Sequence, residues 1–424
     1  MAQSSGTRSR VPVELKIEVS PVSARFSDLL KRSRLETPCY VFFEEALREN
    51  CERASALIRP TGTNFLYSMK SLEVAPILKI IAEYVDGFAA SSLFEAQLAR
   101  DILKGNKGHI HLTTPGLRPH EIPLLTEICS SITLNSLRQY HTLKPLFPAG
   151  QDLGLRINPQ HQVAKNEQFD PCCDNSRLGV RLTEIAVQLH RDGDLLKNFS
   201  GIHFHTNCEG DDFRDLEDTV DIVIEVLGDH LRDVKWINLG GGYYFNNPKC
   251  PEAFGRSIEK LKSNCQLETY FEPGGGIVNS AGYLVSTVLD IVGNAHQMTA
   301  VLDTSVNHLP ESLEFGYEPD VFGDTEEGSR KYTLAGASCL AGDVFGDYAF
   351  AEPLKIGEQV VMENVGAYSH AKCHSFNGIN IPTIYIVDQE LNISELVSFE
   401  YQDFARKNGL DQDFARKNGL EYIA

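Results

Sequence analysis

The sequence predicts an α/β protein in which a (β/α)8 barrel is followed by a second, mostly β domain. Three observations lead to this fold class. Short apolar runs alternate with helical periodicity between residues 36 and 282, the pattern turns β-rich after residue 283, and 424 residues are more than one core usually needs. We therefore expect a leader over residues 1–35, the barrel over 36–282 and the second domain over 283–424.

The barrel prediction depends on eight strand-like runs, each of which ends in a polar residue or a glycine. In chain order they are FLYSMK, VDGFAAS, HIHLTT, SITLNS, LGLRIN, IHFHTN, WINLGGG and LETYFEPG. Segments between them, such as LEVAPILKIIAEYV, place apolar residues three and four apart, as an amphipathic helix requires. Eight such strands alternating with helices are typical of a closed (β/α)8 barrel.

The part of the chain after residue 283 predicts a sheet. Its runs YLVSTVLDIVG, TAVLDTS, QVVMENVGAY and PTIYIVDQ have glycine and proline between them and little helical periodicity. We expect the leader, otherwise partly disordered, to be able to add a strand to this sheet. The tail repeats QDFARKNGL at 402–410 and 412–420, which is too short for a repeat fold. A local duplication, a frayed helix and a sequence artefact all remain open as explanations.

Composition excludes several classes of protein. The formal net charge of -19 argues against nucleic acid or an anionic membrane as the partner, because both require basic faces. There is no apolar run long enough for a membrane helix, and the start of the chain lacks the apolar core of a secretory signal. The ten cysteines lack zinc-ligand spacing, so we expect no metal, reduced thiols and a cytoplasmic location.

Candidate site residues lie at the carboxyl ends of the predicted strands, where barrels place their catalytic groups. These ends supply Lys70, Ser91, Ser92, Asn135, Asn158, His205, Gly240, Gly241, Gly242, Glu272, Gly274, Gly275 and Gly276. The clusters LGGGYY and EPGGGI follow the seventh and eighth runs. Barrels commonly bind a phosphate there, through backbone N–H groups and a helix N-terminus.

A phosphate site, a lysine and a carboxylate at one barrel mouth favour pyridoxal phosphate as the cofactor. Lys70 would form a Schiff base, and burial would lower its pKa so that the neutral amine can attack. Glu272 beside the pyridine nitrogen would keep that nitrogen protonated and make the ring an electron sink. Taken alone, Lys70 also fits a lysine at a strand end whose amine reaches solvent.

A histidine could stack on the cofactor ring. His205 is the candidate, His203 is the alternative, and we expect at most one of them to face the barrel mouth. Either ring also fits a satisfied core histidine.

Several longer motifs then point to one family. The segment SCLAGDVFGDYAF, at 338–350, occurs together with VLDTS, SRLG, HTNCE and SFNGINIPTIY in one order. In these motifs the chain resembles the pyridoxal-phosphate decarboxylases with an alanine-racemase-like fold, also called fold type III. Within that family it is most similar to the carboxynorspermidine (carboxyspermidine) decarboxylases. The likeness runs from TPCYVF at 37–42 to FEYQDF at 399–404.

The resemblance implies roles for the residues that bind the cofactor. Lys70 would hold it covalently, His205 would stack on its face and Glu272 would pair with its pyridine nitrogen. The residues implied at its phosphate are Gly241, Gly242, Gly274 and Tyr368.

The resemblance also implies residues outside the cofactor site. Cys339 would donate a proton in the partner subunit's site, so a homodimer with shared active sites is expected. Asp303 and Asp343 would lie at the substrate, with Asp303 near a distal amine. Judged without the family, Tyr368 fits a half-buried core residue, Asp303 a turn residue and Cys339 a buried thiol.

The implied reaction is α-decarboxylation of a small cationic substrate, carboxynorspermidine or carboxyspermidine, in polyamine biosynthesis. Two departures leave the substrate open: Gly275 replaces the glutamate usual after EPG, and the segment after Asp303 is one residue shorter and lacks a glutamate. Diaminopimelate, ornithine, lysine or an analogue from a specialised pathway are therefore alternatives. A racemase is disfavoured because racemases of this type place an arginine where Glu272 stands. A non-catalytic cofactor-binding protein is disfavoured because Lys70 and Cys339 are both present.

Overall fold

The structure, a computed structural model, describes Phe26, Leu29 and residues 34–105, 108–164, 169–294 and 297–410. It divides into a unit of residues 1–36 and a unit of residues 37–424, and the fold below belongs to the second unit. Almost all of the expected leader and the second copy of the tail repeat, 412–420, lie outside the described residues. The first copy lies in α12, Tyr401–Lys407, and the residues that follow it.

Eight parallel strands close into a barrel. They are β2 Asn64–Ser68, β3 Gly87–Ala90, β4 His109–Thr113, β5 Ser131–Leu134, β6 Leu153–Asn158, β8 Gly201–His203, β9 Trp236–Asn238 and β10 Glu268–Phe271. Pairing of β5 with β6 completes the ring, and the two-residue strand β7, Val180–Arg181, pairs with β6. Each run identified in the sequence overlaps one of these strands, so the (β/α)8 prediction is confirmed.

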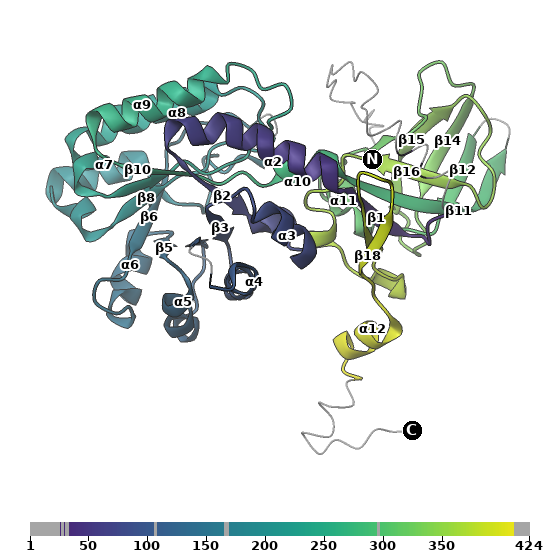
Figure 1. The fold of residues 1–424 in the computed structure, drawn as a ribbon, viewed down its shortest axis with the longest axis horizontal. Helices are drawn as coiled ribbons and strands as arrows, with labels where there is room; N and C mark the ends of the chain where they lie inside the picture. Colours follow the sequence, from purple (N-terminus) through teal and green to yellow (C-terminus); the bar gives the residue numbers. More distant parts are fainter. Residues whose placement is uncertain are drawn as a thin grey trace, which may run out of the picture. The chain divides into compact units, whose positions relative to one another are not determined.

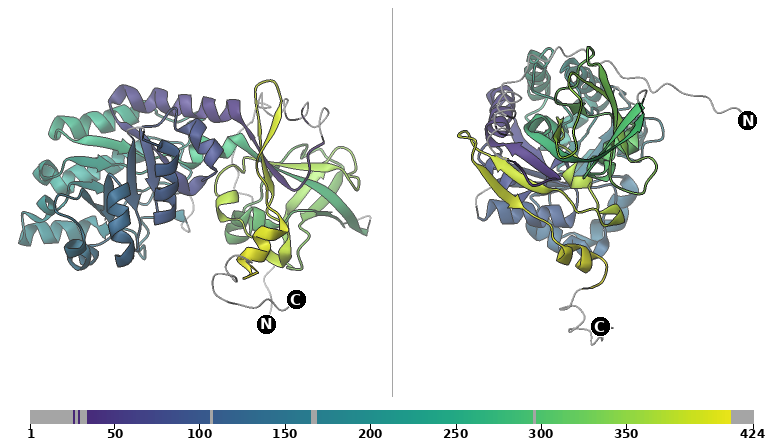
Figure 2. Two further views of the ribbon diagram at one scale, coloured as in Figure 1. Left: turned by 60° about the horizontal axis from the view of Figure 1, so that its bottom comes forward. Right: turned by 90° about the vertical axis from the view of Figure 1, so that its right-hand side faces the viewer.

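Helices lie on the outside of the barrel strands (Figure 1), and two further views show the same arrangement (Figure 2). They are α2 Glu44–Ile58, α3 Ala75–Ile81, α4 Leu93–Leu103, α5 Ile122–Ile128, α6 Leu137–Leu143, α7 Leu182–Arg191, α8 Arg214–Leu227 and α9 Glu252–Asn264. A further short helix, α10 Gly275–Val278, follows β10 at the carboxyl end of the barrel. In α8 the buried residues Leu216, Val220, Val223 and Leu227 recur every three or four positions. This spacing places them on one helix face toward the strands.

Aromatic rings fill the barrel interior below the carboxyl ends of its strands. Trp236 packs with Tyr270, and a Cβ added at Gly154 or Gly201 would lie 2.4 or 2.0 Å from indole carbons of Trp236. His111 adds a third ring, with its centroid 4.3 Å from that of Tyr270. The interior is therefore a packed core, and space for a ligand lies at the carboxyl ends of the strands.

The second domain is a sheet whose strands come from distant parts of the chain. They are β1 Cys39–Phe43, β11 Gly282–Asn294, β12 Gln297–Leu302, β13 Asp320–Val321, β14 Arg330–Ala335, β15 Val344–Phe350, β16 Gln359–Glu363, β17 Thr383–Val387 and β18 Ile393–Val397. A short helix, α11 Pro310–Phe315, follows β12. The mostly β character expected after residue 283 is confirmed, and β11 begins at Gly282.

Strand β1 falls within the range expected for the barrel, but it pairs with the second sheet. Cys39 lies opposite Val285 of β11 in antiparallel register and opposite Thr383 of β17 in parallel register. The run CYVFF is buried at every position. A strand buried on both faces has no alternating pattern, so its sequence does not indicate which sheet it joins.

Candidate active site

Lys70 lies directly after β2 in a single turn of 3-10 helix, Met69–Ser71. The turn is held by the Ser71 hydroxyl, which donates to the Ser68 carbonyl over 2.6 Å, and by the Tyr368 N–H, which donates to the Ser71 carbonyl over 2.8 Å. The side chains of Met69 and Ser71, on either side of Lys70 in this turn, are buried. The apolar run therefore ends in a turn that presents one amine to the barrel mouth.

The Lys70 side chain is exposed by surface area because it faces an open cavity. It nevertheless lies deep in the protein, and the loss of water there lowers its pKa; Glu272 opposes this shift and Arg156 adds to it. A lower pKa raises the fraction of neutral, nucleophilic amine.

The glycine turns after β9 and β10 pack too closely for side chains. A Cβ on Gly241 would lie 2.2 Å from the Glu272 carbonyl oxygen, and one on Gly242 would lie 2.1 Å from the Asn207 carbonyl oxygen. A Cβ on Gly274 would lie 2.3 Å from Ser71 Oγ, beside Lys70. Glycine is therefore required where these loops meet, and it leaves their backbone bare beside the cavity.

Gly275 differs from the glycines around it. A Cβ there would meet the Ala367 and Tyr368 side chains at 3.7 Å, which is ordinary contact. The position where relatives are expected to carry a glutamate thus has room for a Cβ.

Glu272 follows β10 and is almost fully buried. Its Oε1 lies 3.1 Å from His203 Nε2, and its Oε2 accepts a 2.9 Å hydrogen bond from the Asn238 side-chain amide. Burial alone would raise the pKa of this carboxyl, but its interactions with the hydrogen-bond donors His203 and Asn238 outweigh burial and hold the pKa below its usual value. Glu272 is therefore an anion at neutral pH.

His205 lines the cavity, and its Nδ1 accepts a 3.1 Å hydrogen bond from the Gly241 N–H. Burial, reinforced by the charges of Lys70 and Arg156, places its pKa well below the usual value. The ring is therefore neutral and carries its proton on Nε2. His203 lies one layer deeper, 1% exposed, so His205 is the one of the two that reaches the mouth.

The cavity opens to solvent. Its lining contains most of the residues expected to bind the cofactor. They are Lys70, His205, Gly242, Glu272, Gly274 and Tyr368. Burial raises the pKa of the Tyr368 hydroxyl, so that this group remains an O–H donor.

Three polar residues at other strand ends have structural roles. Ser92 caps α4 by accepting the Glu95 N–H over 3.2 Å, and the Glu95 carboxylate accepts the Ser91 N–H over 2.6 Å. Asn135 holds the 177–179 loop through Arg177 and Gly179. These positions resemble catalytic ones because helix caps and active sites both follow barrel strands.

Cys339 is exposed on the loop between β14 and β15, and it is not among the described residues that line the cavity. Its N–H donates to Asn377 Oδ1 over 2.8 Å. The same loop is organised by buried Asp343, which accepts the N–H groups of Val306 at 2.7 Å and Ser338 at 3.0 Å. Asp343 thus supports the loop that presents the Cys339 thiol.

Asp303 accepts hydrogen bonds at both of its carboxylate oxygens. The donors are the Thr37 hydroxyl at 2.6 Å, the Ser286 hydroxyl at 2.6 Å and the Thr287 N–H at 2.9 Å. Like Asp343, it does not belong to the described lining of the cavity. The expected contact of both aspartates with substrate stays a prediction.

Several residues at the site were not singled out from the sequence. Ser68, Cys208, Glu209 and Tyr244 line the cavity. Arg156, buried in β6, adds positive charge near Lys70 and Glu272 although burial lowers its pKa to about 10. Arg156 could have been identified from the sequence, because a charged residue inside the apolar run LGLRIN indicates that its side chain has polar surroundings.

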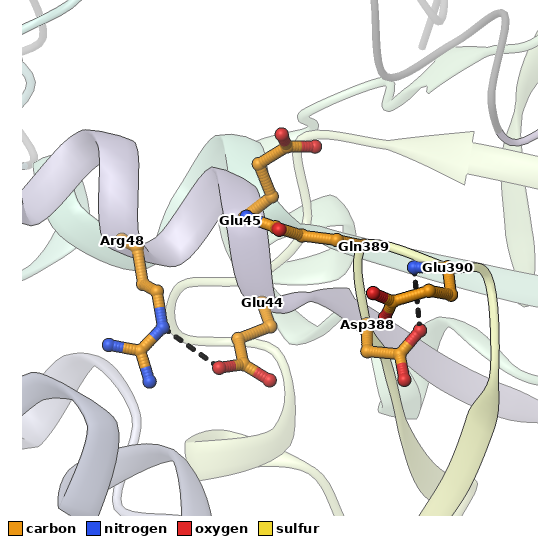
Figure 3. A pocket seen from close by; sticks show the side chains of 6 residues that line it. All are labelled: Glu44, Glu45, Arg48, Asp388, Gln389 and Glu390. Carbon is orange, nitrogen blue, oxygen red and sulfur yellow. Dashed lines mark hydrogen bonds and ion pairs between the residues drawn. The ribbon is translucent and has the colours of Figure 1, made fainter.

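A second hollow lies between α2 and the loop after β17, lined by Glu44, Glu45, Arg48, Asp388, Gln389 and Glu390 (Figure 3). Arg48 Nε donates to Glu44 over 2.8 Å, and Asp388 accepts the Glu390 N–H over 2.9 Å. None of the residues assigned to the cofactor lies in it.

The described residues contain no group of three or more histidine, cysteine or acidic side chains arranged to hold a metal ion. Nor does any helix within them have the length and apolar character needed to cross a bilayer.

The geometry fits pyridoxal phosphate. Lys70 supplies an amine of lowered pKa, Glu272 a buried anion, His205 a neutral ring at the cavity wall, and the glycine turns a bare backbone beside it. A parallel barrel that carries these groups at its carboxyl ends, followed by a β domain, defines a pyridoxal-phosphate enzyme of the alanine-racemase-like class.

Comparison with known families agrees. The family model described as pyridoxal-dependent decarboxylase, C-terminal sheet domain, matches residues 39–366. The chain belongs to the pyridoxal-dependent decarboxylases. Its cofactor is pyridoxal phosphate and its reaction class is decarboxylation, as the resemblance implied.

Individual relatives extend the match over nearly the whole chain. The chain is 31% identical over 396 residues to carboxynorspermidine/carboxyspermidine decarboxylase of Campylobacter jejuni, covering 88% of this chain and 99% of the relative. It is 32% identical over 383 residues to carboxyaminopropylagmatine decarboxylase of Synechocystis, covering 89% and 96%.

Solved structures give the same picture. Carboxynorspermidine decarboxylase of Campylobacter jejuni, complexed with norspermidine, superposes with a TM-score of 0.78 at 29% identity, covering 88% of this chain and all of the other. Diaminopimelate decarboxylase of Helicobacter pylori, complexed with L-lysine, has the same TM-score at 18% identity, covering 90% and 99%. The second likeness shows the shared fold.

Proposed function

We propose that the chain removes the α-carboxyl group of a carboxylated polyamine, carboxynorspermidine or carboxyspermidine, to give norspermidine or spermidine. The observation that carries the proposal is the match to Campylobacter jejuni carboxynorspermidine/carboxyspermidine decarboxylase, which spans 99% of that enzyme. The sequence resemblance in the SCLAGD segment supports the same branch of the family.

A second candidate substrate is carboxyaminopropylagmatine. The Synechocystis enzyme named for it is 32% identical, as similar to the chain as the Campylobacter jejuni enzyme is. Both substrates are carboxylated polyamines, so the two candidates share a reaction and differ in the distal end of the molecule. Diaminopimelate, ornithine and lysine remain less favoured alternatives.

Acidic groups around the cavity support a substrate with cationic arms. Glu209 lines the cavity, and the partly buried Glu73 and Glu95 lie near each other beside the Lys70 turn. Burial raises the pKa of both carboxyl groups. The charge of Glu95 raises the pKa of Glu73 further, whereas the Ser91 N–H and the charge of Lys70 oppose the shift of Glu95. A protonated amine placed among such carboxylates would compensate their charge.

The bound cofactor would supply an electron sink for the pair of electrons left when CO2 departs. Lys70 would form the covalent bond to it through its neutral amine, and His205 would pack its neutral ring against the cofactor face. Anionic Glu272 would hold a proton on the pyridine nitrogen, and the Tyr368 hydroxyl would donate to the phosphate. Gly241, Gly242 and Gly274 would bring backbone N–H groups close to that phosphate.

The remaining roles require a second subunit. We propose a homodimer in which Cys339, exposed on its own chain, reaches the partner's cavity and protonates the reacting carbon. Asp343 would support that loop, and Asp303 would act at the substrate from the same domain. Ten free thiols among the described residues support a cytoplasmic location for the dimer.

The direct test is to incubate the cofactor-loaded protein with each candidate substrate and measure CO2 release and product mass. The panel is carboxynorspermidine, carboxyspermidine, carboxyaminopropylagmatine, diaminopimelate, ornithine and lysine. The proposal predicts the highest kcat/KM for one of the first two. A clear preference for carboxyaminopropylagmatine selects the second candidate, and a preference for diaminopimelate, ornithine or lysine overturns the proposal.

A further inference from the structure

The cofactor-facing glutamate has a partner that the reaction scheme above does not use. His203, on β8, is 1% exposed and places Nε2 3.1 Å from Glu272 Oε1. Asn238, on the adjacent strand β9, donates to the other oxygen over 2.9 Å. The carboxylate is therefore held at both oxygens by donors from two strands, which fixes the plane in which it meets the cavity.

The second ring nitrogen of His203 determines the protonation state. His203 Nδ1 is buried and has no hydrogen-bond partner in the described part of the chain. If the ring were doubly protonated, an N–H at Nδ1 would be buried without an acceptor. If the single proton were on Nδ1, a lone pair at Nε2 would face the lone pairs of the carboxylate. Only the neutral ring with its proton on Nε2 avoids both costs.

We propose that His203 is a positioning residue: as a neutral imidazole it donates Nε2–H to Glu272 and holds that carboxylate as an oriented anion for the ring nitrogen of the cofactor. A neutral donor fixes the position of the carboxylate without cancelling its charge. A lysine or arginine at position 203 would form an ion pair with Glu272 and reduce the negative charge left for the cofactor. The inference depends on the cofactor and not on which substrate is used.

The surroundings of His203 favour the neutral ring. Burial lowers its pKa; Glu272 opposes that shift, while Arg156 and Lys70 add to it. His111 also lies in the barrel interior. Burial lowers its pKa to about 3; His109 and His203 add to this shift, and Glu272 opposes it. The positive groups near His203 thus discourage a further cation among them.

The first test observes the tautomer directly. The full-length holoenzyme is labelled with 15N-histidine, and the His203 signals are assigned by comparison with His203→Gln. The expected spectrum has a protonated Nε2 and an unprotonated Nδ1 at neutral pH. A signal pattern of an imidazolium, or of the Nδ1–H tautomer, overturns the proposal without reference to activity.

The second test compares replacements that differ in one donor. Glutamine can place its amide N–H near the position of Nε2, whereas leucine removes the donor at similar size. His203→Leu is expected to lower kcat by about ten- to a hundredfold, the range for a hydrogen bond to a charged group, and His203→Gln to restore most of it. The absorbance of the bound cofactor is followed as the pH is lowered. The pH at which this absorbance changes on the acidic side, where Glu272 takes up a proton, should be higher in His203→Leu than in the wild type and unchanged in His203→Gln.

His111→Leu is the matched control, because it also removes a buried barrel imidazole with an unpartnered Nδ1 but no hydrogen bond to Glu272. It is expected to leave the acidic absorbance transition in place even where stability falls. If His203→Gln and His203→Leu shift that transition equally, or if neither differs from His111→Leu, His203 serves only to fill the core. Should His203→Leu fail to fold, the tautomer measurement still decides.

Discussion

The N–H of Gly241 lies 3.1 Å from Nδ1 of His205, so one glycine of the turn after β9 sets the tautomer of the ring at the cavity wall. The same residue touches Glu272 on its other side, where an added Cβ would lie 2.2 Å from the carbonyl oxygen. One backbone position therefore connects the histidine and the glutamate that are expected to contact the cofactor.

Replacing Gly241 by alanine should weaken cofactor binding. The added methyl group must push the β9 and β10 turns apart, and overpacking of this kind costs about 1–3 kcal/mol, or roughly 5- to 100-fold in affinity. Cofactor titration followed by absorbance measures the effect. Gly255→Ala in α9, where a Cβ meets nothing within 4 Å, is the control and should bind the cofactor as the wild type does. Equal affinities for all three proteins would contradict the packing argument.

Lys70 should carry the covalent bond to the cofactor. Borohydride reduction of the loaded enzyme is expected to leave a stable adduct, which peptide mass spectrometry should place on Lys70. Lys70→Ala should form no adduct and lose about three orders of magnitude or more in kcat. Lys79→Ala, on helix α3, controls for the loss of a nearby lysine. An adduct on any other lysine of the wild type would refute the assignment.

Glu73 should make stability fall as the pH rises. Burial, with the charge of Glu95, raises its pKa from 4.5 to about 7. Between these values the folded state binds a proton that the unfolded state has lost, so the free energy of unfolding decreases with rising pH. Above pH 7 the penalty is fully present, and below pH 4.5 it is absent.

Glu73→Gln should therefore unfold at higher urea concentration than the wild type at pH 8 and at the same concentration near pH 4. The gain at pH 8 is expected to be about 1–2 kcal/mol, allowing for partial exposure. Glu326→Gln, at an exposed position, provides the matched control. A gain that is as large at pH 4 as at pH 8 would show that the carboxyl charge is not responsible.

Cys339 should act in the site of the partner subunit. Lys70→Ala and Cys339→Ala, each inactive in isolation, are expected to recover activity when the two proteins are mixed and allowed to exchange subunits. With random pairing, half of the dimers contain one subunit of each variant, and each of these mixed dimers has one intact site and one doubly mutated site. The largest activity that mixing can restore is therefore about 25% of the wild-type value. No recovery despite subunit exchange, confirmed by native mass spectrometry, would place the thiol in the site of its own chain.

Asp303→Asn separates a structural role from a substrate role. The carboxylate accepts three hydrogen bonds within the protein, from Thr37, Ser286 and Thr287. Weakening them should lower stability by about 1–3 kcal/mol. Asp229→Asn, whose side chain is 88% exposed, should change stability little. A large rise in KM for Asp303→Asn with unchanged unfolding would support contact with a substrate amine instead.

The sequence predicts much of the barrel and its mouth because local patterns carry that information. Lys70 and Glu272 end apolar runs, and the glycine clusters follow the last two strands. Each signal is complete within about ten residues, so it is visible without knowledge of distant contacts.

The parts that the sequence analysis did not identify depend on contacts between distant segments. Asn238 and Arg156 lie inside strand runs and become part of the site only when the barrel brings them near Glu272. Asp303 likewise looks free to bind a substrate until Thr37, 266 positions earlier in the chain, is found donating to it. Side-chain partners of this kind cannot be read from periodicity.

The placement of β1 between β11 and β17 sets an order of assembly during synthesis. Its two neighbours begin at Gly282 and Thr383, whereas the barrel strands are complete by Phe271. On the ribosome, the barrel can close while the segment from Cys39 to Phe43 still lacks both partners. That segment must wait, apolar and unpaired, until more than a hundred further residues have emerged. A chaperone that protects exposed strands would therefore have its longest task at β1, the first strand among the described residues.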